Sequence, residues 1–223
     1  MVPEVNVKTV KQTRSLTPRR PVRVHITTPT RESPAVCIET PRLLLRPMVP
    51  EDRQEMIQRL KAGRDHLSSL LPINSDDDSP AKVFDRQLEL ATSGDESGKS
   101  FRRLATNRAG EIVGAFGLVV IRRGLECNAD LSFWLFPQYT GVGLAREGLL
   151  ALMSYSLADL PEGLGMHRID AWVRPDNVAC QKVISACGYT KSGDESTHLA
   201  TGEKWQIHER WELTVINWQR EFG

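Results

Sequence analysis

The residues best suited to chemistry in this chain lie at positions 138–145, which read Gln-Tyr-Thr-Gly-Val-Gly-Leu-Ala. An apolar run at 131–136 precedes them, and residues 146–157 carry apolar side chains at helical spacing, so the predicted order is strand, loop, helix. The first N–H groups of a helix have no partner inside it, and the helix dipole adds about half a positive charge there. The loop is therefore predicted to bind an anion. The alternative is a plain strand-to-helix turn that uses glycine for a positive φ angle.

Two familiar phosphate loops do not fit this segment. A P-loop needs Lys and then Ser or Thr after its last glycine, whereas Leu144 and Ala145 follow Gly143. A dinucleotide fingerprint needs the spacing G-x-G-x-x-G, which Gly141, Gly143 and Gly148 do not provide. The pattern that remains is Gln-x-x-Gly-x-Gly-x-Ala.

The elements around this loop are expected to alternate between strands and helices. Further helices are predicted at 52–60, 81–91 and 178–186. Strands are predicted at 39–47, 101–106, 111–121, 127–136, 167–173 and 205–215, with a last hairpin turning at 201–203. The expected fold class is therefore mixed α/β, of the α+β kind, without an internal repeat.

The composition of the chain indicates one packed domain, with 40% hydrophobic and 26% charged residues among 223. The net charge of +1 predicts no general attraction to nucleic acid or to a membrane surface. No apolar run approaches the roughly 18 residues that span a bilayer, and no secretory signal begins the chain. The cysteines show no zinc spacing, so reduced thiols in a cytoplasmic protein are expected: Cys37, Cys127, Cys180 and Cys187.

Residues 1–36 differ from the rest because they hold seven Lys or Arg, two Glu and five Pro. We expect a mobile basic extension ahead of a folded domain at 37–223. It is either a solvated tail or a docking segment for an anionic partner such as RNA or the ribosome. The three Asp at 76–78 lack the Gly and distal Glu of a calcium loop and are expected to lie at a helix N-terminus. No metal site is predicted.

Three further segments carry a resemblance to a known family. They read Leu-Gly-Met-His-Arg-Ile at 164–169, Pro-Asp-Asn-Val-Ala-Cys at 175–180 and Cys-Gly-Tyr at 187–189. With the glycine loop, they resemble the GNAT superfamily of N-acetyltransferases. Residues 39–46 and 128–135 resemble its RimJ/RimL-like branch of ribosomal-protein acetyltransferases. The resemblance covers about 39–215 and implies a mostly antiparallel sheet, flanked by helices and splayed between its fourth and fifth strands, with acetyl-CoA as co-substrate in the cleft.

The resemblance also implies roles for single residues. Backbone groups of Phe133, Trp134 and Leu135 would hold the pantetheine arm, with Asn177 beside it, although Asn177 is also a natural helix N-cap. The pyrophosphate would be wrapped by the loop, namely Gln138, Thr140, Gly141, Val142, Gly143, Leu144 and Ala145.

Position 180 differs from the RimJ/RimL-like branch, which usually has Ser there, near the coenzyme A sulfur that leaves in the reaction. Cys180 could donate a proton to the coenzyme A thiolate, although a thiol is a weaker donor than a hydroxyl. It could equally be a packed helix residue, and a nucleophilic role is a third reading that lacks a neighbouring base.

The resemblance implies direct attack of a neutral amine on the thioester. An α-amino group has a pKa of about 7.7–8.0, whereas a lysine amine at about 10.4 costs roughly 4–5 kcal/mol to deprotonate at pH 7. A modest base therefore suffices for an N-terminal amine. The candidates are Asp130, otherwise a strand-end carboxylate, and His198, otherwise a surface histidine.

The sequence does not identify the acceptor amine. A protein or peptide N-terminus is the first expectation, and a small-molecule amine is the alternative. A non-catalytic acyl-CoA-binding regulator is a third possibility, which the cysteine at position 180 keeps open. A monomer or a homodimer, without a membrane partner, is expected.

Overall fold

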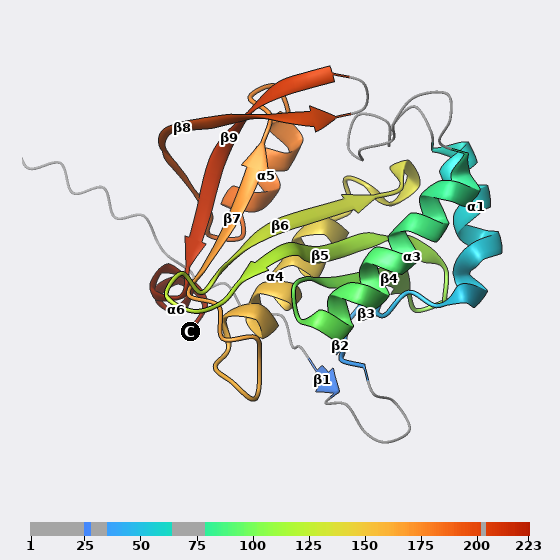
Figure 1. Cartoon of the computed structure of the whole chain (residues 1–223), viewed down its shortest axis with the longest axis horizontal. Helices are drawn as coiled ribbons and strands as arrows, with labels where there is room; N and C mark the ends of the chain where they lie inside the picture. The colour runs from blue at the N-terminus through green and yellow to red at the C-terminus, as the bar shows by residue number, and fades with distance from the viewer. Residues whose placement is uncertain (1–24, 28–34, 64–78, 202–203) are drawn as a thin grey trace, which may run out of the picture.

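The computed structural model describes residues 25–27, 35–63, 79–201 and 204–223, and these residues form one nine-stranded sheet (Figure 1). The strand order is β1-β2-β3-β4-β5-β6-β7-β9-β8. The expectations for residues 76–78, for most of 1–36 and for the hairpin tip at 202–203 lie outside the described residues. The strand bounds are β1 His25–Thr27, β2 Cys37–Glu39, β3 Leu43–Arg46, β4 Phe101–Asn107, β5 Ile112–Arg122, β6 Asn128–Leu135, β7 Arg168–Val173, β8 Thr190–Thr201 and β9 Lys204–Thr214.

The sheet is antiparallel except at its centre, where β6 and β7 run parallel. This parallel ladder, called the seam below, pairs Asn128 with Arg168, Ala129 with Ile169 and Asp130 with Asp170. Beyond it β6 and β7 continue without pairing to each other and diverge (Figure 1). The expected mixed α/β class and the splayed, mostly antiparallel sheet are confirmed.

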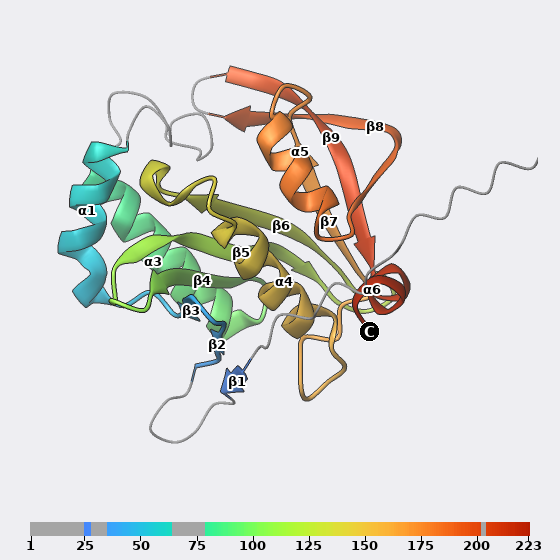
Figure 2. The ribbon, with the colours of Figure 1, turned by 180° about the vertical axis from the view of Figure 1, so that it is seen from behind.

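Helices cover both faces of this sheet. The helices α1 and α3 lie over one face, and α4 and α5 lie over the other, as Figures 1 and 2 show from opposite sides. The helix bounds are α1 Arg53–Ala62, α3 Pro80–Ser97, α4 Leu144–Leu157, α5 Val178–Ser185 and α6 Val215–Phe222, with short 3-10 turns η1 Pro50–Asp52 and η2 Pro137–Tyr139. No helix in the described part of the chain is both long and apolar enough to cross a membrane.

The helix that follows the glycine loop is the most deeply buried one. Eleven residues of α4 are buried, which explains why it is apolar on nearly every side rather than along one stripe. Gly148 lets the helix approach the sheet, because a Cβ at this position would lie 2.4 Å from Cζ of Phe116. The position of α4 against the sheet, and therefore of the loop at its start, is set by this close packing.

Three element boundaries differ from the sequence prediction for local reasons. The strand expected at 39–47 is interrupted, since Thr40 closes a turn onto Leu43 and Pro41 cannot donate to a ladder. Helix α3 runs to Ser97 through a polar stretch without apolar spacing, and Gly98 ends it with φ 65°. Helix α6 was not predicted; its N-cap is Thr214, which accepts from the N–H of Asn217 at 3.2 Å. Within 1–36, the described residues His25–Thr27 pair with β2.

Candidate active site

The predicted anion loop leads from β6 into the first turn of α4. Gly141 and Gly143 have φ angles of 76° and 85°, a region that glycine adopts without strain. The backbone N–H groups of residues 141–146 donate to no acceptor among the described residues, whereas the N–H of Glu147 bonds Gly143. Consecutive unpaired N–H groups at a helix start form a concave anion site. The loop therefore fits a pyrophosphate.

A buried carboxylate fixes this loop to the turn between β2 and β3. Oε1 of Glu147 accepts from Oγ1 of Thr40 at 2.7 Å and from the N–H of Arg42 at 2.8 Å, and Oε2 accepts from Nε of Arg42 at 2.6 Å. The Arg42 guanidinium also donates to the carbonyl of Val142 at 2.8 Å. Burial alone would raise the pKa of Glu147, but the bonds from Thr40 and Arg42 outweigh it and lower the pKa below its usual value. We call these contacts the loop clamp.

The divergence of β6 and β7 opens a cleft of about 120 Å³. Three of the predicted residues line it together, namely Phe133 from β6, Asn177 from the turn after β7 and Cys180 from α5. Beyond the seam, the edge of β6 that faces β7 forms no ladder, so its backbone groups are available to an extended ligand. The remaining lining residues are Leu131, Ser132, Ala171, Trp172, Val173, Arg174 and His208.

The thiol in this cleft is a neutral one. Burial raises the pKa of Cys180 to about 12. At pH 7 only about one thiol in 10⁵ would be ionised, so Cys180 is unsuited to act as a nucleophile. A neutral thiol can still donate a weak hydrogen bond. Asn177 caps α5 by accepting from the N–H of Cys180 at 3.0 Å, which places the two residues side by side.

The cleft contains a histidine that the sequence did not reveal. His208 of β9 is 5% exposed and lines the cleft with Cys180. Its Nδ1 lies 2.9 Å from the carbonyl oxygen of Gln206, which only a protonated Nδ1 can bond. Nε2 then carries the free lone pair and can accept a proton. The strand was predicted, but its periodicity does not say which face points into a cleft formed by three other elements.

The two predicted bases lie elsewhere. Asp130 forms a bidentate ion pair with Arg122 at 2.7 and 3.1 Å, and its backbone pairs with Asp170 across the seam. His198 is an exposed residue of β8, paired with Ile207 of β9. Neither residue belongs to the described lining of the cleft.

Two residues predicted to follow Phe133 in the cofactor site are also held by the sheet. Trp134 and Leu135 are buried, and their backbones pair with Ala115 and Gly114 of β5. The Trp134 ring meets Phe136 edge-on, with the ring centroids 5.1 Å apart. Their side chains are therefore structural, and a cofactor role for them is limited to backbone groups.

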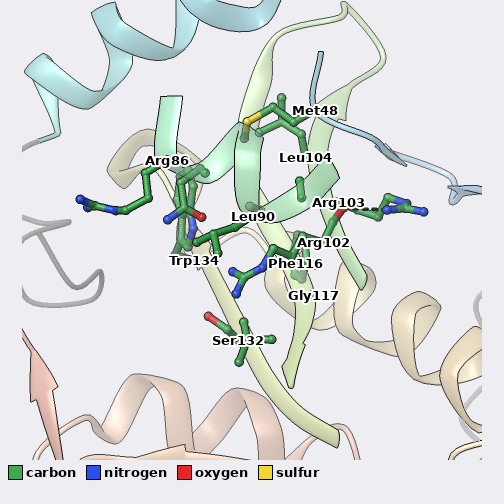
Figure 3. Close-up of a pocket in the computed structure, with 14 residues that line it drawn as sticks. Met48, Arg86, Leu90, Arg102, Arg103, Leu104, Phe116, Gly117, Ser132 and Trp134 are labelled. Atoms are coloured by element: carbon green, nitrogen blue, oxygen red, sulfur yellow. Dashed lines mark hydrogen bonds between the residues drawn. The ribbon is translucent and has the colours of Figure 1, made fainter. Parts of the chain in front are cut away.

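A second and larger cavity, of about 510 Å³, lies between α3 and strands β4, β5 and β6 (Figure 3). Ser132 lines both this cavity and the cleft. The two spaces therefore lie on either side of this residue of β6, one on the α3 face of the sheet and one at the splay. Among the described residues, no cluster of His, Cys, Asp and Glu could hold a metal ion.

Comparisons with known proteins agree with this geometry. A "Probable N-acetyltransferase YjcK" of Bacillus subtilis (strain 168) is 22% identical over 176 residues, covering 78% of this chain and 94% of the relative. The structure of Mycobacterium smegmatis RimJ in complex with CoA-disulfide matches with a TM-score of 0.68 and 22% identity, over 77% of this chain and 81% of the other. The ribosomal-protein-S5-alanine acetyltransferase from Vibrio fischeri matches with a TM-score of 0.70 and 21% identity, over 82% and 98%.

The family is established over most of the chain. The family model described as the acetyltransferase (GNAT) domain matches residues 42–190, which include Arg42 and Glu147 of the loop clamp, the anion loop, the seam and Cys180. The splayed sheet and the unpaired loop N–H groups are the features that such a domain needs for its acyl donor. This chain therefore belongs to the GNAT acetyltransferase family and is an acyltransferase.

Proposed function

We propose that this chain transfers an acetyl group from acetyl-CoA directly to the α-amine of a protein or peptide N-terminus. The observation that carries the proposal is the row of unpaired N–H groups at 141–146, which lies at the end of a strand that opens a cleft. The structural neighbours named as ribosomal-protein acetyltransferases support a protein acceptor. Acetyl-CoA would supply an activated thioester.

The residues of this chain have separate roles in the proposed reaction. The loop at 141–146 binds the pyrophosphate, and the free edge of β6 at Phe133, together with Asn177, orients the pantetheine arm. Cys180 stays protonated and donates a hydrogen bond to the departing sulfur. Nε2 of His208 accepts the proton that the amine loses. Direct attack fits because the only thiol that lines the described cleft is un-ionised.

A small-molecule amine is the second candidate, because a cavity of about 510 Å³ accommodates a small ligand as well as the first residues of a peptide. Residues 1–36 would give a protein acceptor, or the RNA around it, a basic docking segment. We further propose that the enzyme works in the cytoplasm.

The test is release of free thiol from acetyl-CoA by the purified chain. Peptides with N-terminal Ala or Ser are compared with a panel of small amines, and Gly143→Val, which strains the anion loop, is the matched control. Thiol release with peptides that Gly143→Val abolishes is the expected result. Release with small amines alone would move the assignment to the second candidate. Tight acetyl-CoA binding without release for any amine would indicate a regulator.

A further inference from the structure

The larger cavity contains an arginine that no described carboxylate neutralises. The residues lining this cavity include Arg86, Arg102 and Arg103, and none of the described lining residues is Asp or Glu. Nε of Arg102 is buried and has no hydrogen-bond partner. Its guanidinium forms no ion pair with the described residues, and burial without an opposing charge lowers the pKa of the group.

The neighbouring residue, Arg103, differs from Arg102 because its guanidinium charge is paired with a carboxylate. Arg103 donates to both oxygens of Asp95 at 3.0 Å and to the carbonyl of Val36 at 2.8 Å, and it stacks on Phe101 at 3.7 Å. Arg103 is therefore a structural residue. Arg102, one position away on the opposite side of β4, has none of these partners. Arg102 is partly buried, and a charge partly withdrawn from water without a partner is costly, so its presence needs a reason.

Arg102 belongs to a row that crosses three strands. The register pairs Arg102 of β4 with Gly117 of β5, and Gly117 with Ser132 of β6. A Cβ at Gly117 would lie 3.4 Å from Cγ of Arg102, so the stem of Arg102 lies against this glycine. Figure 3 shows the Arg102 guanidinium extending toward Ser132. Adjacent strands lie about 4.8 Å apart, so the backbones of Arg102 and Ser132 lie two strand spacings apart, or about 10 Å, and the long Arg102 side chain extends across part of that distance.

We propose that this cavity binds the acceptor amine, and that Arg102 pairs with a carboxylate which the acceptor carries a few atoms from that amine. The amine must reach the cleft past Ser132, the residue that lines both spaces. A guanidinium that extends toward this residue selects a carboxylate close to the amine. The side chain of an N-terminal Asp or Glu has this chemistry, and so does the carboxylate of a free amino acid. The inference rests on the proposed acetyl transfer and names its acceptor class.

The kinetic test uses acceptors that differ only in charge. One pair is a C-terminally amidated peptide beginning Asp-Ala and its Asn-Ala counterpart; the other is free alanine and alaninamide. For one pair we expect kcat/KM to favour the acid by about tenfold to a hundredfold, as a charge-assisted hydrogen bond does. Arg102→Gln should reduce this ratio to within about twofold, and Arg102→Lys should keep part of it. Which pair responds identifies the source of the carboxylate.

Arg86 provides the matched control. It lines the same cavity, but Figure 3 shows its guanidinium directed away from Arg102 and Ser132. Arg86→Gln removes the same charge from the same cavity wall and should preserve the acid preference. Equal rates for both members of both pairs in the unmodified enzyme would overturn the proposal, as would an acid preference that survives Arg102→Gln.

Two measurements do not depend on turnover. Removing an unpaired and partly buried charge should raise the midpoint of thermal unfolding in Arg102→Gln, whereas loss of a structural arginine would lower it. The acetylated products, N-acetyl-Asp-Ala amide and N-acetylalanine, are titrated into the coenzyme A complex by calorimetry. One of them should bind at least about tenfold more weakly to Arg102→Gln. If no amine is acetylated but this binding difference appears, acetyl transfer fails and the carboxylate site stands. If neither product depends on Arg102, the carboxylate site fails.

Discussion

Alkylation of Cys180 by iodoacetamide should be slow, and its rate should rise tenfold per pH unit up to pH 10. With a pKa of about 12, about one Cys180 thiol in 10⁴ is ionised at pH 8, against about a quarter of ordinary cysteines at a pKa of about 8.5. The rarer thiolate is more nucleophilic, by about 40-fold for a Brønsted slope of about 0.45. The two effects combine to a rate about 60-fold below that of an ordinary cysteine.

The assay follows the Cys180 peptide by mass spectrometry after timed exposure to the reagent between pH 7 and pH 10. The same cysteine in guanidinium-denatured protein is the reference, because unfolding restores an ordinary thiol without changing the sequence. The decisive quantity is the dependence of the alkylation rate on pH, because restricted access of the reagent to Cys180 would lower the rate equally at every pH. A plateau below pH 9, or a rate that matches the denatured reference, would show a poised thiolate. Such a result would refute both the neutral-thiol role of Cys180 and the direct-attack mechanism.

Three further predictions concern stability and turnover. Glu147→Gln should lower the free energy of unfolding by about 2–3 kcal/mol and weaken acetyl-CoA binding, because the loop clamp loses its charge. Since the pKa of Glu147 is lowered on folding, the deficit in denaturant melts should be full above about pH 4.3 and shrink as the pH falls further; a constant deficit would contradict it. Gly148→Ala should cost about 1–2 kcal/mol net, as the clash with Phe116 exceeds the gain in helix propensity, and a raised melting temperature would disprove this. His208→Gln should lower kcat about 100-fold at pH 7 and leave the affinity for acetyl-CoA unchanged. The activity should partly recover at higher pH, where more of the acceptor amine has already lost its proton to solvent. A loss of kcat below threefold would exclude a proton-accepting role.

The parts of the site that the sequence predicted are those encoded by local spacing. The glycine loop and α4 follow from a strand, two glycines and a helical period in adjacent residues. Asn177 and Cys180 were expected in the site because residues 175–180 resemble a short motif of the family, and they lie at the start of α5. The contacts between distant segments could not be predicted this way. The loop clamp joins Thr40 to Glu147 across 107 positions. The sequence predicted a strand around Thr40 and a helix around Glu147, but not the contact between them.

The side-chain directions on strands were the second unpredictable feature. His208 lines the cleft because β9 pairs with β7, one of the two strands that diverge, and this pairing joins residues far apart in the sequence. The predicted base Asp130 meets Arg122 across β5 and β6, where the register shifts between Leu118 and Val120. An irregularity of this kind changes which residues lie on the same face of the sheet, and it cannot be predicted from the alternation of apolar and polar residues in the sequence.

The short seam has a consequence for the lifetime of the protein. Three residue pairs join β6 to β7, whereas eight join β5 to β6 and six join β7 to β9, so the seam is weaker than the ladders on either side of it. A ligand that fills the cleft bonds both strands and supplies what the ladder lacks. Occupancy at 100 times the dissociation constant would add about 2.7 kcal/mol to the stability of the folded chain. Amide hydrogens of Ala129 and Ile169 should then exchange faster in the free protein than in its coenzyme A complex. The supply of the acyl donor would thus set how long the enzyme survives proteolysis as well as how fast it works.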